Sequence, residues 1–391
     1  MGKDLKGREL GPGIHQRKSG SYTARFTDRF GNRRSIYSSD LEELRKKFVE
    51  EQYKNEIGIN VYSDKVTISE WFTEWMDTYK KNIVRESTFA TYTQYFRSYI
   101  EPVLGKRKLD SVRSAEITKL LKSMKDGGFS YDTRNGVRII LQDMYNKAIL
   151  NELAHKNPVA GVRVHRDERR EVRYLSKVEQ KEFFKCSNGT FYHNLFIVAV
   201  STGMRIGEIA ALTENDLDFG SRIIHVTKNL LYTKFEGDVK KTYKFGPPKT
   251  ATSIRDVPMT DECMTALKDQ IRLKRIVANR ISARIPKGFE DLLFVTSVNT
   301  PLNDQDVTQA IRAVLRQINL TLDDCEQIES FSFHCFRHTF ATRCFEVGMS
   351  PKVIQGLLGH AHQSMTMDLY THLTDEKKEE ELKKLPGVYD S

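Results

Sequence analysis

Apolar residues recur at intervals of three and four along most of this chain, which is the spacing that one face of an α-helix produces. Residues that are typical of helix N-termini support two of the predicted helix starts. One is at Thr67, where Glu70 follows three positions later, and the other is at Ser350, which is followed by Pro351. The segment 102–105 breaks the pattern. Helices are predicted over residues 67–79, 87–100, 114–125, 131–151, 263–283, 304–318, 333–347, 351–358, 365–373 and 375–384, with further ones after Ser176 and near Asn157.

Strict alternation of polar and apolar residues, which is typical of strands, is confined to a few stretches. Residues 21–28 and 33–38 alternate on either side of Arg29-Phe30-Gly31-Asn32, so they predict paired strands. Asp40 then caps a helix that begins with Leu41. Further strands are predicted over 222–228 and 292–295, and within 230–258, where turns fall at 236–238 and 246–248.

A chain of 391 residues is too long for one ordinary core, and two or three domains are expected. Two stretches are typical of linkers, residues 58–65 and the charged run 163–173. We therefore predict a multidomain protein with three parts. These are a small α+β sheet module over residues 1–60, an all-α domain over 66–164, and a mixed, mainly-α domain with a small antiparallel β-sheet over 174–391.

Composition narrows the functional classes. No apolar run approaches the roughly 20 residues that span a bilayer, and no signal-peptide pattern opens the chain, so a cytoplasmic protein without membrane contact is expected. The five cysteines are scattered without a C-x-x-C pair and are interpreted as free thiols. The formal charge of +10 favours a polyanionic partner, although charge alone also fits a membrane surface or RNA.

Basic residues gather in the first two predicted domains. Residues 1–36 hold nine Lys/Arg against three Asp/Glu, a net charge of +6, on a sheet that a DNA major groove can accept. A solvated sheet face without a partner is the alternative. The candidate DNA contacts are Arg25, Arg29, Arg33 and Arg34 in this sheet, and Arg85, Thr88, Lys106, Arg107 and Arg134 in the helical domain.

Candidate chemistry is concentrated near the carboxy terminus. His334 and Arg337 share one helix face, His360 follows Gly359 after the next helix, and Tyr370 lies on a short helix beyond it. Much earlier, an apolar segment ends at Gly203, so Arg205 is expected near a helix N-terminus, where free amides and a guanidinium fork suit a phosphate. This ordered set is what chemistry on a phosphodiester requires.

In their order and most of their spacing, these motifs resemble those of the tyrosine recombinases, and with the amino-terminal modules they are most similar to integrases of conjugative transposons. The resemblance implies an arm-type DNA-binding domain, a core-binding (SAM-like) domain and a catalytic domain with the tyrosine recombinase fold. Lys249 corresponds to the family's hairpin lysine, although Lys240, Lys241 and Lys244 compete for that role. Ten positions separate His360 from Tyr370, where many relatives have nine.

The resemblance also implies a mechanism. Arg205 and Arg337 would neutralise the phosphate, and Tyr370 would attack it to give a 3′-phosphotyrosine. His334 would act as the base, His360 would hydrogen-bond the phosphate or phenolate, and Lys249 would protonate the leaving 5′ oxygen. Glu208 is expected to orient Arg205 or His334. The implied working unit is a tetramer on two DNA duplexes, serving integration and excision of a mobile element, with an excisionase and a host DNA-bending protein as partners.

Neither a metal nor another cofactor is expected. The chain has no Walker A loop and no carboxylate cluster suited to two magnesium ions. His334 and His338 have zinc-ligand spacing, but Arg337 lies between them and the glutamate of a zincin is absent. Two other functions stay open at this point, a type IB topoisomerase-like DNA relaxing enzyme and a non-catalytic DNA-binding regulator.

Overall fold

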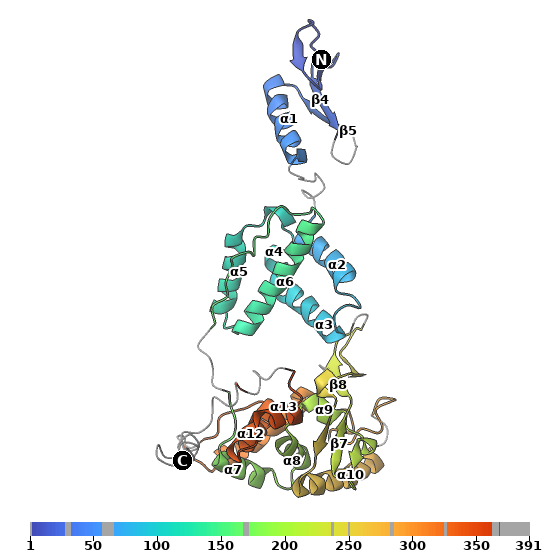
Figure 1. The fold of residues 1–391 in the computed structure, drawn as a ribbon, viewed down its shortest axis with the longest axis vertical. Helices are drawn as coiled ribbons and strands as arrows, with labels where there is room; N and C mark the ends of the chain where they lie inside the picture. Colours follow the sequence, from blue (N-terminus) through green and yellow to red (C-terminus); the bar gives the residue numbers. More distant parts are fainter. Residues whose placement is uncertain are drawn as a thin grey trace, which may run out of the picture. The chain divides into compact units, whose positions relative to one another are not determined.

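The computed structural model describes residues 2–27, 33–56, 66–166, 172–235, 238–248, 251–281, 285–323, 327–361 and 367. The chain divides into two compact units, Met1–Arg169 and Arg170–Ser391 (Figure 1). Helices dominate both units, and the antiparallel sheets are small. The predicted fold class is confirmed.

The amino-terminal module packs a sheet against one helix. Its core consists of Leu10, Ile14, Ala24, Leu44 and Phe48. The three-stranded antiparallel sheet has the order β3-β4-β5, beside a small β1-β2 hairpin. The bounds are β1 (Gly2–Lys3), β2 (Glu9–Gly11), β3 (Ile14–Gln16), β4 (Tyr22–Thr27), β5 (Arg33–Ser38) and α1 (Leu41–Glu56).

The strand register decides which arginines share a face. Arg25 pairs with Ser35 and Thr27 pairs with Arg33, so Arg25 and Arg33 lie on one face, and both are exposed. Arg34 pairs with Phe26, whose side chain packs against the core, so Arg34 belongs to the opposite face. Arg34 therefore lies on a different face of the sheet from Arg25 and Arg33, and its contact with DNA stays a prediction. Arg29 lies outside the described residues.

The second predicted domain is helical throughout. Thr67 caps α2 reciprocally with Glu70, as its sequence predicts, and the indole of Trp71 donates to the Met144 carbonyl at 2.9 Å across the core. The bounds are α2 (Ile68–Tyr79), α3 (Glu86–Tyr95), a π-helical turn η1 (Phe96–Ile100), α4 (Glu101–Leu104), a 3-10 turn η2 (Leu109–Ser111), α5 (Ser114–Asp126) and α6 (Tyr131–Leu150).

Two details of this domain differ from the sequence prediction. The helix that was expected to end before Pro102 continues through α4 to Leu104, because proline is tolerated in the first turn of a helix and α4 follows the π-turn. Near Asn157 the chain forms a turn in place of a short helix.

The candidate DNA-contacting residues of this domain differ in how far they are exposed to solvent. Arg85, Lys106 and Arg107 are exposed and Thr88 is half-buried, as a DNA-facing surface would require. Arg134 is only 3% exposed, and its Nε donates to the Phe129 carbonyl at 3.0 Å. The expectation that Arg134 faces a phosphate backbone is wrong, because its guanidinium is enclosed within the fold.

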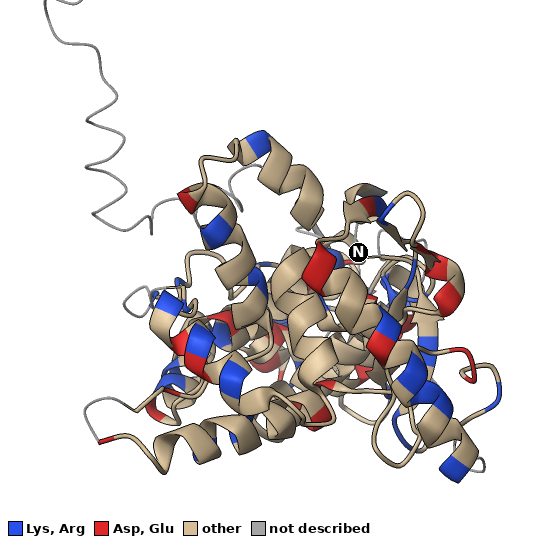
Figure 2. Ribbon diagram, turned by 90° about the horizontal axis from the view of Figure 1, so that it is seen from below, with Lys and Arg blue, Asp and Glu red and all other residues tan. Residues whose placement is uncertain are grey.

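Charged residues of both signs are spread over the molecule. Lys, Arg, Asp and Glu are interspersed along the helices in Figure 2.

The second unit surrounds a large apolar core with helices and a small sheet of order β10-β7-β6, beside the β8-β9 hairpin. Figure 1 shows α12 next to α13. The bounds are α7 (Lys177–Ser187), α8 (His193–Thr202), α9 (Ile206–Ala210), η3 (Glu214–Asp216), β6 (Leu217–Asp218), β7 (Ile223–Val226), β8 (Asn229–Thr233), β9 (Thr242–Gly246), η4 (Ala251–Ser253), β10 (Arg255–Pro258), α10 (Asp261–Arg280), α11 (Asp304–Asn319), α12 (His334–Glu346) and α13 (Pro351–Leu358).

Local signals place most of these boundaries. Ser176 and Glu179 form the predicted capping box of α7, and Ser350 caps α13 with Pro351 in its first turn. The strand predicted over 292–295 is reduced to isolated bridges at Leu292 and Val295. The helices predicted over 365–373 and 375–384 lie outside the described residues, apart from Met367.

Candidate active site

The turn between α8 and α9 brings Arg205 to the carboxy-terminal helices. Gly203 ends α8 with a φ of 63°, and a Cβ added there would lie 2.6 Å from Phe340 and 2.7 Å from Leu358. Only glycine fits this left-handed position so close to α12 and α13. The chain then turns into α9, with Arg205 at its N-cap position, as expected.

Arg337 is held by the backbone on two sides. Its Nη1 donates to the Gly203 carbonyl at 2.7 Å and its Nη2 donates to the Leu358 carbonyl at 2.7 Å. The side chain is buried, and its Nε has no hydrogen-bond partner among the described residues. Since buried donors are normally paired, this Nε–H is available to donate a hydrogen bond to a ligand oxygen.

Glu208 connects two further arginines. Its Oε1 accepts from Arg205 Nη1 at 2.8 Å, and its Oε2 accepts from Arg255 Nη2 at 3.0 Å. Glu208 is buried, and burial raises its pKa, but Arg255 and then Arg205 outweigh burial, so the pKa lies below its usual value. Glu208 is therefore a carboxylate in contact with Arg205, and the expectation that it orients Arg205 or His334 stays a prediction.

Positive charge exceeds negative charge in this cluster. Arg205, Arg255 and Arg337 surround the single carboxylate of Glu208. Burial, followed by the charge of Arg205, lowers the pKa of Arg337 to about 9, so the guanidinium keeps its proton at neutral pH. Arg205 is 27% exposed at its side chain. Arg337 is thus a desolvated cation, and Arg205 beside it is accessible to solvent. Together they favour the binding of an anion from the solvent side.

The two candidate histidines lie in the same positive environment. His360 is buried directly after Gly359, and burial, then Arg337 and Arg205, lower its pKa to about 3. Burial, then the same two guanidiniums, lower the pKa of His334 to about 4. Both imidazoles are neutral near pH 7.

The structure therefore brings together Arg205, Glu208, His334, Arg337 and His360. Lys249 and Tyr370, the candidate acid and nucleophile, lie outside the described residues. Of the competing lysines, Lys241 lies 5.7 Å from the Tyr232 ring and Lys244 lies 5.4 Å from the Phe235 ring, on the β8-β9 hairpin.

Sequence reasoning missed Arg255. Its strand, β10, alternates, with Val257 buried in the core, so Arg255 shares the inward side of the strand with Val257. A charged residue on an inward-facing position was the available signal. Its Nε donates to the Leu357 carbonyl at 2.6 Å and its Nη1 donates to the Ser253 carbonyl at 3.0 Å, in addition to the contact with Glu208.

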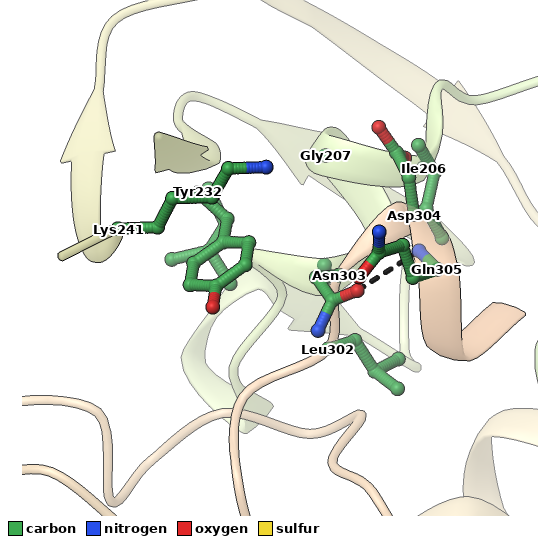
Figure 3. A pocket seen from close by; sticks show the side chains of 10 residues that line it. Ile206, Gly207, Tyr232, Lys241, Leu302, Asn303, Asp304 and Gln305 are labelled. Atoms are coloured by element: carbon green, nitrogen blue, oxygen red, sulfur yellow. Dashed lines mark hydrogen bonds between the residues drawn. The ribbon is translucent and has the colours of Figure 1, made fainter. Parts of the chain in front are cut away.

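A small pocket of about 130 Å³ lies beside α9, whose Ile206 and Gly207 line it (Figure 3). Tyr232 and Lys241 border it from the hairpin, and Asn303 and Gln305 border it from the start of α11. Asn303 Oδ1 accepts from the Gln305 amide at 2.8 Å, so this N-cap is already occupied. In the part of the chain that the structure describes, no group of three or more His, Cys, Asp or Glu side chains is placed to hold a metal ion.

Comparison with known proteins identifies the family. The model of the phage integrase family matches residues 171–377, that of its N-terminal SAM-like domain matches 67–125, and that of the DNA-binding domain of Tn916 integrase matches 1–55. The chain belongs to the phage integrase family. It is a tyrosine-type site-specific recombinase, as its motifs indicated.

Individual relatives cover nearly the whole chain. The transposase from transposon Tn916 of Enterococcus faecalis is 28% identical over 98% of this chain and 96% of its own length. A solved Tn1549 transposon integrase in complex with a circular intermediate DNA is 25% identical, covers 82% of this chain and 100% of that chain, and has a TM-score of 0.68. A lambda integrase tetramer bound to a Holliday junction shares the fold at 19% identity and a TM-score of 0.56, over 93% of this chain and 95% of that chain.

No helix among the described residues is both long and apolar enough to cross a membrane.

Proposed function

We propose that this recombinase integrates and excises a mobile element by cutting and rejoining duplex DNA through a 3′-phosphotyrosine on Tyr370. The observation that carries the proposal is the surplus of buried positive charge around Arg337. Its Nε, which has no hydrogen-bond partner in the described part of the chain, and its neighbour Arg205 suit the non-bridging oxygens of a phosphate. Relatives from transposons Tn916 and Tn1549 support the mobile-element assignment.

Each side chain then has a distinct role. Arg205 and Arg337 neutralise the phosphate while the Tyr370 oxygen attacks phosphorus, the P–O5′ bond breaks, and Lys249 supplies the proton to the 5′ oxygen. His334 accepts the phenol proton, because its neutral imidazole has a free electron pair at neutral pH. His360 donates to the phosphate. The ester conserves the bond energy, so another strand's 5′-hydroxyl can reseal it without ATP.

The other domains bind DNA in this proposal. The amino-terminal module places Arg25 and Arg33 in a major groove at arm-type sites, and the helical domain places Arg85, Lys106 and Arg107 on core-type DNA. The boundaries are those of the sequence analysis, 1–60, 66–164 and 174–391. Four copies act on two duplexes in the bacterial cytoplasm, with an excisionase and a host DNA-bending protein as assisting partners.

A covalent trap tests the proposal. The protein is incubated with a nicked duplex from the element's end in the presence of a metal chelator, then separated on a denaturing gel. An adduct that wild type forms and Tyr370→Phe does not supports the proposal. No adduct on a duplex that the protein demonstrably binds contradicts it. Two further assays distinguish recombination from topoisomerase activity. A recombinase exchanges strands between two duplexes, whereas a topoisomerase only relaxes a supercoiled duplex.

A further inference from the structure

The side chain of Arg255, which is only 6% exposed, contacts three parts of the second unit. It contacts the carbonyl of Ser253 in its own segment, the carboxylate of Glu208 on α9, and the carbonyl of Leu357 near the end of α13. These parts are far apart in the sequence, since 47 positions separate Arg255 from Glu208 and 102 separate it from Leu357.

The same residue lies against the turn that presents His360. Gly359 has a φ of 65°, and a Cβ added there would lie 3.1 Å from the Thr252 carbonyl oxygen and 3.1 Å from Arg255 Cδ. The glycine thus allows α13 to end directly on Arg255. Because Arg337 Nη2 holds the neighbouring Leu358 carbonyl, two arginines fix the last turn of α13.

Resting on the proposed function, we propose that Arg255 is a positioning residue for DNA cleavage, which sets Arg205 through Glu208 and His360 through the Leu357 carbonyl. Its guanidinium is almost fully buried and each of its three nitrogens already donates to a protein oxygen, so we assign it no direct contact with the phosphate. Loss of Arg255 therefore lowers the rate of the chemical step more than the affinity for DNA.

The test compares Arg255→Lys and Arg255→Gln with Arg275→Gln, a control that removes an exposed arginine paired with Glu214 on the surface. Covalent adduct formation is followed in a single turnover at saturating nicked duplex, and DNA affinity is measured separately on an unnicked duplex. Both measurements are made well below the melting temperature of every variant.

We expect Arg255→Gln to slow adduct formation about 100-fold, the effect of displacing catalytic groups by roughly 1 Å, with DNA affinity changed less than about threefold. Arg255→Lys, which keeps the charge but not the three-way contact, recovers part of the rate. Arg255→Gln combined with Glu208→Gln costs less than the product of the two single effects, because both act through one contact.

Wild-type rates in Arg255→Lys and Arg255→Gln would overturn the positioning role while leaving the proposed function intact. Equal losses of rate and affinity would also overturn it, since they indicate general damage to the fold. Absence of an adduct with the wild-type protein would instead overturn the proposed function, and this inference with it.

Discussion

The Arg337 guanidinium donates at 2.7 Å to the carbonyl of Gly203, a residue 134 positions earlier in the chain. This bond joins the helix that carries His334 to the turn that presents Arg205. The two arginines of the site are therefore placed relative to each other by the backbone of the protein. Such preorganisation is what electrostatic stabilisation of a phosphate requires.

The first prediction concerns that turn. Gly203→Ala should lower the free energy of unfolding by about 3 kcal/mol, because the new methyl group meets Phe340 and Leu358 in addition to the strain of a positive φ. Gly348→Ala is the matched control, since Gly348 also has a positive φ but, apart from its chain neighbours, none of the described residues has an atom within 4 Å of the added Cβ. We expect it to cost about 1 kcal/mol. Urea unfolding measures both, and equal losses would contradict the close approach.

The second prediction concerns the buried carboxylate. Glu208→Gln should destabilise the protein by about 3 kcal/mol, because it leaves the Arg205 and Arg255 guanidiniums without their anion. Glu214→Gln, which removes an exposed pair with Arg275, should change stability by less than about 0.5 kcal/mol. Thermal and urea unfolding provide the comparison. Similar small effects in both variants would show that Glu208 is not needed to balance the cluster.

The third prediction is a pH dependence of stability. The folded pKa of His360, about 3, lies below its unfolded value of about 6.5. The unfolded chain therefore takes up this proton first, and the contribution of neutral His360 is present above about pH 6.5 and lost as the pH falls toward 3. Between about pH 6.5 and 4.5, wild type should lose about 2 kcal/mol more than His360→Gln. Parallel stability curves for the two proteins would contradict the lowered pKa.

Local signals in the sequence predicted much of the fold. The caps at Thr67, Ser176 and Ser350 act within one helical turn, so the sequence alone places those helix starts. Motif order likewise predicted Arg205, His334, Arg337 and His360 as one site. What local signals cannot predict is a contact between distant segments.

Three residues illustrate that limit. Arg255 has partners on α9 and at the end of α13, and these contacts between distant segments could be identified only from the structure. Arg134 was a candidate DNA contact because it is basic, yet its guanidinium donates to the Phe129 carbonyl from within the domain. Arg34 was grouped with Arg25 and Arg33 as a candidate DNA contact, and only the strand register shows that it lies on the other face of the sheet.

The most direct test of the central claim replaces the phosphate at the cleavage position by a neutral methylphosphonate. Arg205→Ala should cleave an ordinary nicked duplex at least about 100-fold more slowly than wild type, because an accessible guanidinium no longer balances the phosphate charge. With the methylphosphonate duplex, Arg205→Ala should recover most of that loss, whereas Tyr370→Phe should stay inactive on both. An Arg205→Ala variant that binds the neutral duplex but stays as slow on it would contradict the account.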